Sequence, residues 1–386
     1  MVSSIERSSD VVDHLAVRWR PDPARPLALD FMQAVQAAID GFLAGQRGLL
    51  SDIGGELDPV LSMARTFLGG GKRLRPAFCL WGHVAGGGEA GGDGVLEAAA
   101  SLDLLHVSAL VHDDLMDGSA TRRGVPSAHR QFEALHGEQD WCGSAEGFGL
   151  AGSVLLGDVL LMWSTEMLAG ATARLGPPGD ERIRTSRRLA ERMRTEVTCG
   201  QYLDVVAQAS PAVDDPQTAV DRAHRVVEYK AARYTVMRPL QIGAALAGAG
   251  EGVHDALATY GSHVGRAFQF RDDVLGVFGD EQVTGKPAGD DLREGKRTLL
   301  LAEARARLDG AALARLDVLV GDPALDEDGL AEARALIESS GARRRLDELI
   351  AEHGEHGLAA LERADLTPDG RTALSALADA ALRRDH

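Results

Sequence analysis

Features of a secreted or membrane-spanning protein are scarce in this sequence. Only three cysteines occur, at Cys79, Cys142 and Cys199, and none belongs to a CxxC pattern, which argues against a disulfide framework and a zinc site. No stretch of about 18 uncharged apolar residues exists, so we expect no transmembrane helix. The first residues contain no continuous apolar segment and do not resemble a signal peptide. These absences favour a cytoplasmic protein with reduced thiols.

Positive charge is also in short supply. The chain has 58 acidic and 41 basic residues and a net charge of −17, which argues against nucleic acid and against a basic membrane-binding face. Lysine occurs only at Lys72, Lys230, Lys286 and Lys296. All four lie in or beside motifs that look phosphate-binding, where a compact, flexible ammonium group differs from a planar guanidinium group.

Signals for β-strands are missing as well, because no segment alternates convincingly and no Asn-Gly hairpin turn is present. Residues 1–26 are polar, contain three prolines near their end, and are predicted to form a disordered arm. Residues 27–386 are predicted to form one all-α domain, a large helical bundle around a central cavity. The expected helices cover residues 27–50, 58–68, 73–85, 95–117, 150–172, 180–209, 215–249, 252–278, 290–308, 311–320, 327–340, 342–354 and 367–384.

A cluster of acids ends the apolar helical pattern at 95–117. Asp113 and Asp117 are four residues apart and share one face of a helix, with Asp114 beside them. Carboxylates gathered at the end of an apolar helix repel one another and lose solvation. A divalent cation removes both costs, and Mg²⁺ prefers carboxylates together with substrate phosphates. The alternative is a solvated acidic helix end.

A second acidic pair makes the metal site the better interpretation. Asp272 and Asp273 also follow an apolar helical run. Two such helix ends could face each other across one cavity and hold several metal ions around a polyphosphate.

Five motifs resemble those of the trans-isoprenyl diphosphate synthases, which are also called polyprenyl synthetases. Within this family, the chain resembles the bacterial geranylgeranyl diphosphate synthases. The resemblance covers residues 30–384, and its motifs are GGGKRLRP at 69–76, HDDLMD at 112–117 followed by RRG, GQYLD at 200–204, FQFRDD at 268–273 and TGKPAGDD at 284–291. It implies the isoprenoid synthase type I fold, a homodimer, and head-to-tail condensation of isopentenyl diphosphate with an allylic diphosphate through a Mg²⁺-assisted carbocation.

The resemblance also assigns roles to residues. Three Mg²⁺ ions would be bound by Asp113, Asp117 and Asp272. The allylic diphosphate would contact Arg122, Lys230, Gln269 and Lys286, and isopentenyl diphosphate would contact Lys72, Arg75, His106 and Arg123. Supporting positions would be Asp114, Asp273, Gln201 and Asp204.

The chain departs from the family pattern at two positions. Gly276 stands where many members carry the last acid of the second cluster, and Ala231 stands where many carry Thr or Ser. These departures put one metal ligand and one hydroxyl contact in doubt. Lys296 matches a motif lysine whose role stays open, and Asp290 and Asp291 are either supporting or simply exposed.

Other classes fit the sequence less well. A type I terpene cyclase needs no isopentenyl diphosphate site, a non-catalytic subunit would have lost acids, and a structural helical protein would not place its lysines in this way.

Product length is predicted from the helix that carries Asp113. One turn upstream lie Ser108 and Ala109, which are small and would leave the cavity open, whereas short-chain members of the family have bulky aromatic residues there. Leu105 and Leu102, roughly two and three turns upstream, could form the floor for a twenty-carbon chain. Geranylgeranyl diphosphate is therefore the expected product, with farnesyl diphosphate or a product of 25 to 35 carbons as alternatives.

Overall fold

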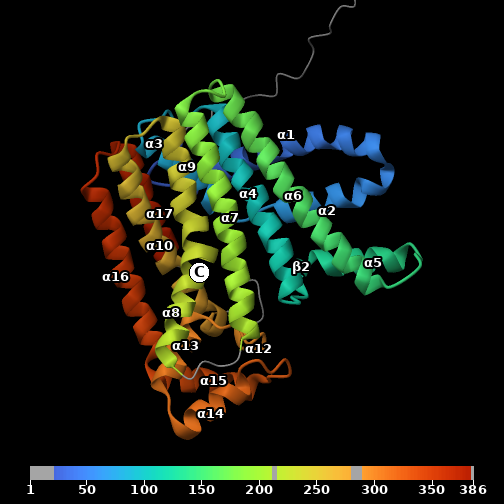
Figure 1. Cartoon of the computed structure of the whole chain (residues 1–386), viewed down its shortest axis with the longest axis vertical. Coiled ribbons are helices and arrows are strands. Elements are labelled where there is room, and N and C mark those ends of the chain that lie inside the picture. Colours follow the sequence, from blue (N-terminus) through green and yellow to red (C-terminus); the bar gives the residue numbers. More distant parts are fainter. Residues whose placement is uncertain (1–20, 211–214, 280–288, 384–386) are drawn as a thin grey trace, which may run out of the picture.

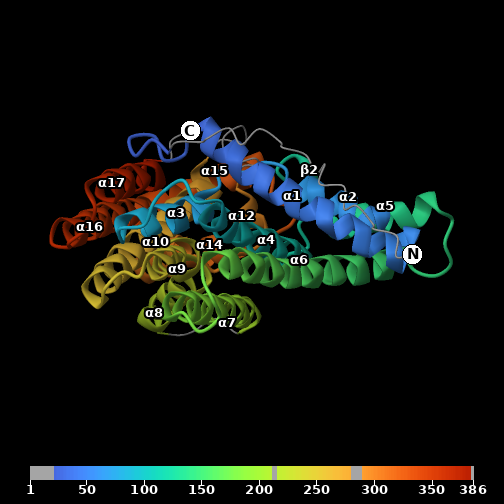
Figure 2. The same ribbon diagram turned by 90° about the horizontal axis from the view of Figure 1, so that it is seen from above.

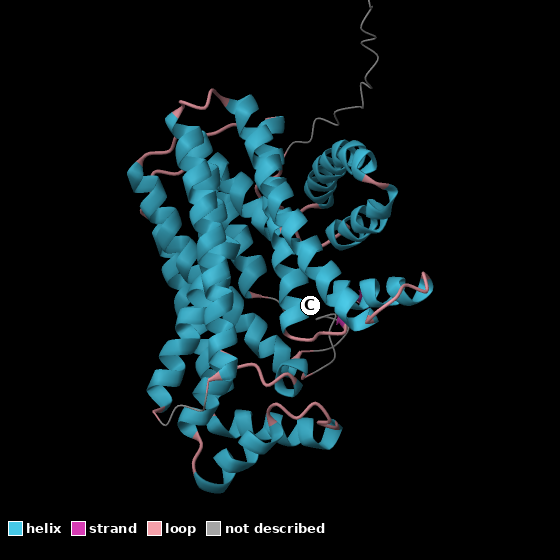
Figure 3. Cartoon of the chain, turned by 45° about the vertical axis from the view of Figure 1, so that its right-hand side comes forward, coloured by secondary structure: helices cyan, strands magenta, loops and turns pink. Residues whose placement is uncertain are grey.

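Helices make up nearly all of the structure, a computed structural model that describes residues 21–210, 215–279 and 289–383 (Figure 3). Residues 1–20 of the predicted arm and Lys286 lie outside the described residues. Residues 21–28 form turns, in which the Asp22 carboxylate accepts hydrogen bonds from the Ala24 backbone N–H and the Arg25 side chain.

The elements follow one another in the order predicted, with a few additions. They are α1 (Leu29–Ile53), η1 (Gly55–Leu57), α2 (Asp58–Leu68), α3 (Leu74–Ala85), α4 (Asp93–Met116), β1 (Thr121–Arg122), β2 (Val125–Pro126), α5 (Ala128–Glu138), α6 (Ala145–Leu175), α7 (Glu181–Ala209), α8 (Pro216–Val226), η2 (Val227–Met237), α9 (Arg238–Ala247), α10 (Glu251–Phe278), α12 (Asp290–Arg293), α13 (Leu299–Arg307), α14 (Gly310–Leu319), α15 (Glu327–Ser340), α16 (Ala342–Glu362) and α17 (Pro368–Leu382).

Long helices stand side by side to form the bundle (Figure 1). The closest packing joins α4 to α6, α3 to α9, and α10 to both α16 and η2. Helices α1, α2 and α5 extend to one side, and α14 and α15 lie across the base of the view. Seen from above, α7 and α8 lie on the side of the bundle opposite α1 (Figure 2). The all-α bundle predicted from the sequence is confirmed.

A π-helical segment, η2, interrupts what the sequence predicted as one regular helix over 215–249. Glycines on both neighbouring helices let the backbone of η2 approach closely. A β-carbon at Gly200 of α7 would lie 2.4 Å from the Lys230 backbone nitrogen, and one at Gly265 of α10 would lie 2.6 Å from the Ala232 Cα. Such π-helical turns are rare and occur often at functional sites.

A two-residue hairpin lies where a loop was predicted, so the expectation of no strands is wrong at this position. Arg123 and Gly124, which connect β1 to β2, have φ values of 52° and 78°. Left-handed backbone at both turn residues suits a tight hairpin, although the pair is not the usual Asn-Gly.

Other predicted helices also differ from the structure, and the one expected over 342–354 continues to Glu362. Helix α6 begins earlier than expected because the Ser144 side chain accepts a hydrogen bond from the Gly147 N–H. The helix expected over 290–308 is divided at Gly295, whose φ is 67°, and it restarts with Thr298 as its cap. Helix α5 lies in a region that the predicted helices left out.

Two helices are long and apolar enough to cross a membrane by length and composition alone, Gly94–Met116 within α4 and Ala145–Leu175. The first is a core helix, with 72% of its most apolar window buried, and the second has 28% of that window buried. The absence of a transmembrane helix therefore stays a prediction.

Replacing Gly265 by alanine tests the close packing of η2. Because the new β-carbon would overlap the backbone at Ala232, we expect Gly265→Ala to lower the free energy of unfolding by about 1–3 kcal/mol. Gly252→Ala is the matched control on the same helix, since nothing lies within 4 Å of its β-carbon position. Urea denaturation measures both, and equal stabilities in the two variants would contradict this account.

Candidate active site

A cavity of about 640 Å³ opens between the helices and collects most of the residues predicted to act. The start of α3, the middle of α4, η2 and the end of α10 all contribute to its wall. The predicted site residues on its lining are Lys72, Arg75, His106, Ala109, Asp113, Arg122, Arg123, Gln201, Asp204, Lys230, Gln269, Asp272 and Asp273.

Asp113 is held by partners on two other helices. Its Oδ1 atom lies 3.0 Å from Lys230 Nζ and accepts a 2.9 Å hydrogen bond from Gln201 Nε2. Lys230 also donates to Asp204 Oδ2 at 2.7 Å. Burial alone would raise the pKa of Asp113, but the charges of Lys230 and Lys296 lower that pKa to about 2. This carboxylate is therefore ionised and ready to bind a cation.

Asp117 is not on the cavity lining, and its side chain is only 4% exposed. Lys296 Nζ is 2.9 Å from Asp117 Oδ2 and 3.1 Å from Glu294 Oε2. The buried Asp117 Oδ2 atom is therefore paired with the Lys296 ammonium group. Burial raises the pKa of Asp117 above its ordinary value despite the nearby lysine.

Arg122 joins the hairpin to the first acidic cluster. Its Nε atom donates to Asp114 Oδ1 at 2.8 Å, and its Nη2 atom lies 4.0 Å from Asp113 Oδ2. Asp114 is buried and is not on the lining of the large cavity. Asp114 thus fixes the Arg122 side chain, and both Arg122 and Arg123 line the cavity.

The second acidic cluster contains one half-buried and one buried carboxylate, and both line the cavity. The buried one, Asp273, accepts hydrogen bonds from Gln269 Nε2 at 2.9 Å and the Leu299 N–H at 3.2 Å. Burial raises the pKa of Asp273 to about 8, although the Gln269 hydrogen bond opposes this shift. Asp273 therefore fixes the end of α10 against α13.

Gly276, one of the two departures from the family pattern, leaves room for an acid from another segment. A β-carbon at Gly276 would lie 1.9 Å from Asp291 Oδ2. Asp291 lines the cavity, and its carboxylate occupies the space that a side chain at position 276 would need. The site thus has a carboxylate here in spite of the glycine. The other departure, Ala231, is a buried part of the cavity wall.

A cationic region lies at the start of α3. Arg75 Nη2 donates to Thr235 Oγ1 at 2.8 Å, and the Arg75 guanidinium carbon lies 4.2 Å from the centre of the Tyr234 ring. The Tyr234 hydroxyl is 3.3 Å from His106 Nδ1. Burial, with Arg75 and Arg123 nearby, holds the pKa of His106 well below its usual range, so this histidine is neutral.

The residues predicted to set product length are divided between two environments. Ala109 lines the cavity, whereas the Ser108 hydroxyl donates a 2.7 Å hydrogen bond to the Gly157 carbonyl of α6 and does not line it. Leu102 and Leu105 are buried in an apolar cluster, which we call the lower cluster and which Ala109 also contacts. Its other buried members are Cys79, Ala98, Ala99, Leu168, Ala171, Ile183, Ala190, Met193, Val197, Tyr234, Ile242 and Leu246.

Sequence reasoning missed Asp103, Tyr234, Thr235 and Glu294. Asp103 precedes His106 by three residues, so helical spacing could have found it on the same face. No sequence signal marked Tyr234 or Thr235, because their direction depends on the π-helical geometry of η2.

The chemistry of these residues fits a divalent cation bound together with a diphosphate. Asp113, Asp117 and Asp272 could supply hard oxygen ligands, and the buried Asp117 Oδ2 atom already faces one cation, the Lys296 ammonium group at 2.9 Å. No group of three acidic, histidine or cysteine side chains converges on one point within 21–210, 215–279 and 289–383. Mg²⁺ needs no such cage, because it keeps waters and uses few carboxylates with substrate phosphates.

Comparison with known proteins places this site in a family. The sequence pattern of the polyprenyl synthetases matches residues 59–337. A geranylfarnesyl diphosphate synthase from Aeropyrum pernix is 35% identical over 274 residues, which is 71% of this chain and 77% of that protein. A geranylgeranyl diphosphate synthase from Methanosarcina mazei is 31% identical over 319 residues, covering 82% and 87% of the two chains.

A solved structure agrees with both. The crystal structure of a geranylgeranyl pyrophosphate synthase from Corynebacterium glutamicum, in complex with isoprenyl diphosphate and magnesium, is 37% identical. It superposes with a TM-score of 0.85 and covers 94% of this chain and 99% of that one. The fold and the site therefore define an isoprenoid synthase of type I. This chain belongs to the polyprenyl synthetase family and is a trans-prenyltransferase that acts on isoprenoid diphosphates.

Gly71 leaves space for the Arg123 side chain beside Lys72, Arg75 and His106, which we call the cationic region together with Arg123. Replacing Gly71 by alanine should therefore weaken substrate binding. A β-carbon at Gly71 would lie 3.1 Å from the Arg123 guanidinium nitrogens, and φ at Gly71 is 97°. Gly70→Ala is the matched control, because φ is 108° but nothing lies within 4 Å. We expect steady-state kinetics to give Gly71→Ala the higher KM for one diphosphate substrate. Equal KM values in the two variants would show that the space beside Gly71 does not determine where the Arg123 side chain lies.

Proposed function

We propose that this enzyme makes geranylgeranyl diphosphate by adding isopentenyl diphosphate to allylic diphosphates. The observation that supports the product length is the position of Ala109. This small side chain lies on the cavity wall and contacts the lower cluster, whose leucines on α4 lie about two and three turns from Asp113. A growing prenyl tail could enter there and stop at those leucines.

The two substrates would bind at opposite parts of the cavity. We assign isopentenyl diphosphate to the cationic region of Lys72, Arg75, His106 and Arg123. The allylic diphosphate is assigned to the acidic side, with Lys230, Arg122 and Gln269. Lys286 belongs to the same proposal but lies outside the described residues. Arginine suits diphosphate because its planar fork can donate two parallel hydrogen bonds.

Mg²⁺ is the cation we propose, with three ions bound by Asp113, Asp117 and Asp272. When bound with the diphosphate, it supplies charge that stabilises the departing pyrophosphate. Lys230 and Lys296 now neutralise the acids, and each can turn its ammonium group toward the diphosphate instead. The apolar lower cluster shields the allylic cation from water. The C=C bond of isopentenyl diphosphate then attacks C1 of that cation, and pyrophosphate takes the proton that leaves.

A longer product is the second candidate, and one observation favours it. The relative from Aeropyrum pernix is named a geranylfarnesyl diphosphate synthase, which makes a chain one unit longer. A farnesyl product is disfavoured because no bulky aromatic side chain occupies position 108 or 109. A terpene cyclase is disfavoured because it would need no isopentenyl diphosphate site, and the four residues assigned to that site, Lys72, Arg75, His106 and Arg123, all line the cavity.

A product assay tests the proposal directly. The purified protein is incubated with Mg²⁺, isopentenyl diphosphate and, in turn, the allylic diphosphates of five, ten and fifteen carbons. Chromatography after dephosphorylation should show a twenty-carbon alcohol as the longest main product. A main product of fifteen or twenty-five carbons would refute the assigned length, and no elongation with any starter would refute the substrates.

Variants on α4 test whether this helix measures the tail. Ala109→Phe should move the main product toward fifteen carbons, because the ring would fill the cavity between Asp113 and the lower cluster. Ser108→Ala is the control, since the Ser108 hydroxyl faces α6, and its product should not change. Leu105→Ala should lengthen the product. An unchanged product in Ala109→Phe would show that α4 does not determine the length of the product.

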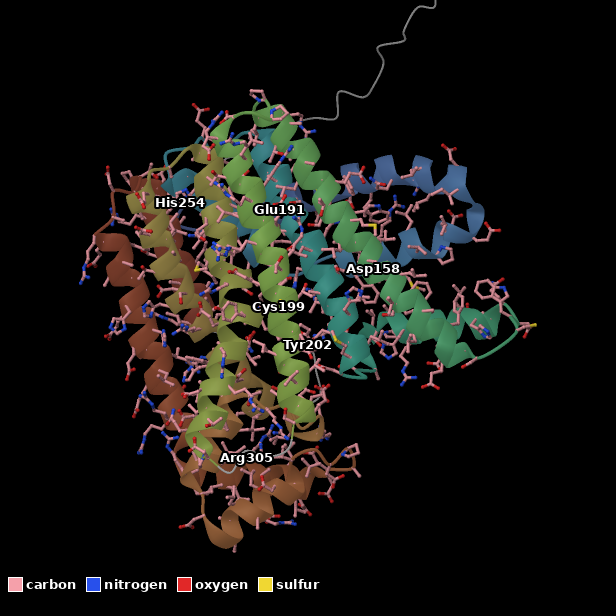
Figure 4. All side chains as sticks on the ribbon, viewed as in Figure 1. Asp158, Glu191, Cys199, Tyr202, His254 and Arg305 are labelled. Atoms are coloured by element: carbon pink, nitrogen blue, oxygen red, sulfur yellow. The ribbon has the colours of Figure 1, made fainter. Side chains whose placement is uncertain are left out.

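We also propose that the enzyme is a cytoplasmic homodimer joined through α6 and α7. The outer side of α6 is apolar, with Leu155 63% and Met162 66% exposed, and Leu150 is exposed on the same helix. On α7, Tyr202 and Cys199 are exposed, and Figure 4 shows them on the same face of the molecule as Asp158 of α6. An apolar face of this extent, flanking the active site, suits a second copy of the chain.

Charges on this face should separate the subunits. Because carboxylates would be buried without partners, Leu155→Glu combined with Met162→Glu should give monomers at micromolar concentration in analytical ultracentrifugation. Val318→Glu is the matched control, since Val318 is 66% exposed on α14, and it should remain dimeric. A monomeric wild-type protein, or a dimeric double variant, would exclude this interface.

A further inference from the structure

The loop that enters α3 contains an unusual arginine between the two cationic residues Lys72 and Arg75. Arg73 has a φ of 51°, in the left-handed region that favours glycine, and it follows Gly70 and Gly71, whose φ values are also positive. Arg73 is the N-cap residue of α3, yet no side chain caps this helix. The backbone therefore needs another contact to hold this conformation.

Buried contacts from three elements hold the Arg73 side chain. Its Nη1 atom is 2.5 Å from Asp103 Oδ2 on α4, and its Nη2 atom donates to the Leu68 carbonyl of α2 at 2.7 Å. The Nη2 atom also donates to Gln36 Oε1 on α1. The Arg73 and Asp103 side chains are only 3% and 5% exposed. The Arg73 guanidinium is thus held by protein partners, in a residue that forms part of the cavity wall.

Asp103 ties this pair to the active site. It lies three residues before His106 on α4, so both project from the same face of the helix. Asp103 also lies close enough to Arg123 for its negative charge to raise the pKa of that guanidinium, which burial otherwise lowers. Asp103 and the residues of the cationic region, Lys72, Arg75, His106 and Arg123, all line the same cavity.

We propose that the buried Arg73–Asp103 ion pair is a positioning device for isopentenyl diphosphate. By fixing the α3 loop to α4, it sets the distance of Lys72 and Arg75 from His106 and Arg123. Thr235 and Tyr234 already hold the Arg75 side chain. The role of Arg73 is therefore to fix the backbone of the loop. This inference rests on the proposed assignment of the cationic region to isopentenyl diphosphate.

The test separates loop positioning from general stability. Arg73→Met leaves the buried Asp103 carboxylate without its ion-pair partner and should both lower the melting temperature and weaken binding. The double variant Arg73→Met with Asp103→Leu removes that charge and should recover much of the melting temperature. Its binding of isopentenyl diphosphate should stay about tenfold or more weaker, because the loop is no longer fixed.

Binding is measured by calorimetry with isopentenyl diphosphate alone, which has no allylic partner to react with. Steady-state kinetics should show a raised KM for isopentenyl diphosphate and little change in KM for the allylic substrate. Arg73→Lys, which keeps the charge but loses the planar fork, is a milder variant and should give an intermediate affinity. It also serves if the methionine variants do not fold.

Arg238→Met is the matched control, because Arg238 is another buried arginine in an ion pair, with Glu196. It should lower the melting temperature without changing the affinity. Wild-type affinity in the folded double variant, or in Arg73→Lys if the double variant does not fold, would overturn the proposal. Failure of the wild-type enzyme to bind isopentenyl diphosphate would instead refute the assignment of that site.

Discussion

The structure depends on neutralising carboxylates that helix packing forces together in a partly dry cavity. Lys230 lies between Asp113 and Asp204, and Lys296 lies between Asp117 and Glu294. Without these two ammonium groups, the acids would repel one another and lose their solvation. In the mechanism that we propose, an incoming diphosphate with its cations would replace each of these lysine–carboxylate contacts.

Packing details place these charges. Glycines on α7 and α10 allow the π-helical segment η2 to approach, and η2 presents Lys230, Tyr234 and Thr235 to one cavity. On the other side, the left-handed turn at Arg123 and Gly124 directs two arginines back toward α4. Irregular backbone at both places costs free energy, and each segment carries side chains of the site.

Periodicity and linear motifs in the sequence predicted the helical bundle, most helix limits and the residues gathered around the cavity. The acidic cluster on α4 could be predicted in this way, because acids four residues apart must share a helix face. The π-helix, the hairpin and the direction of Ser108 could not be predicted, since these depend on contacts between distant segments. Asp291 beside Gly276 is a similar case, because an acid from another segment fills space left by a glycine.

In the proposed mechanism, the acidic ends of α4 and α10 act on one diphosphate. Calorimetric binding of inorganic pyrophosphate in the presence of Mg²⁺ tests it most directly, with wild type, Asp113→Asn, Asp272→Asn and the double variant. If both acids serve one diphosphate–metal cluster, each single change should weaken binding strongly and the double change should add little. Fully additive losses, or wild-type affinity in either single variant, would contradict the account.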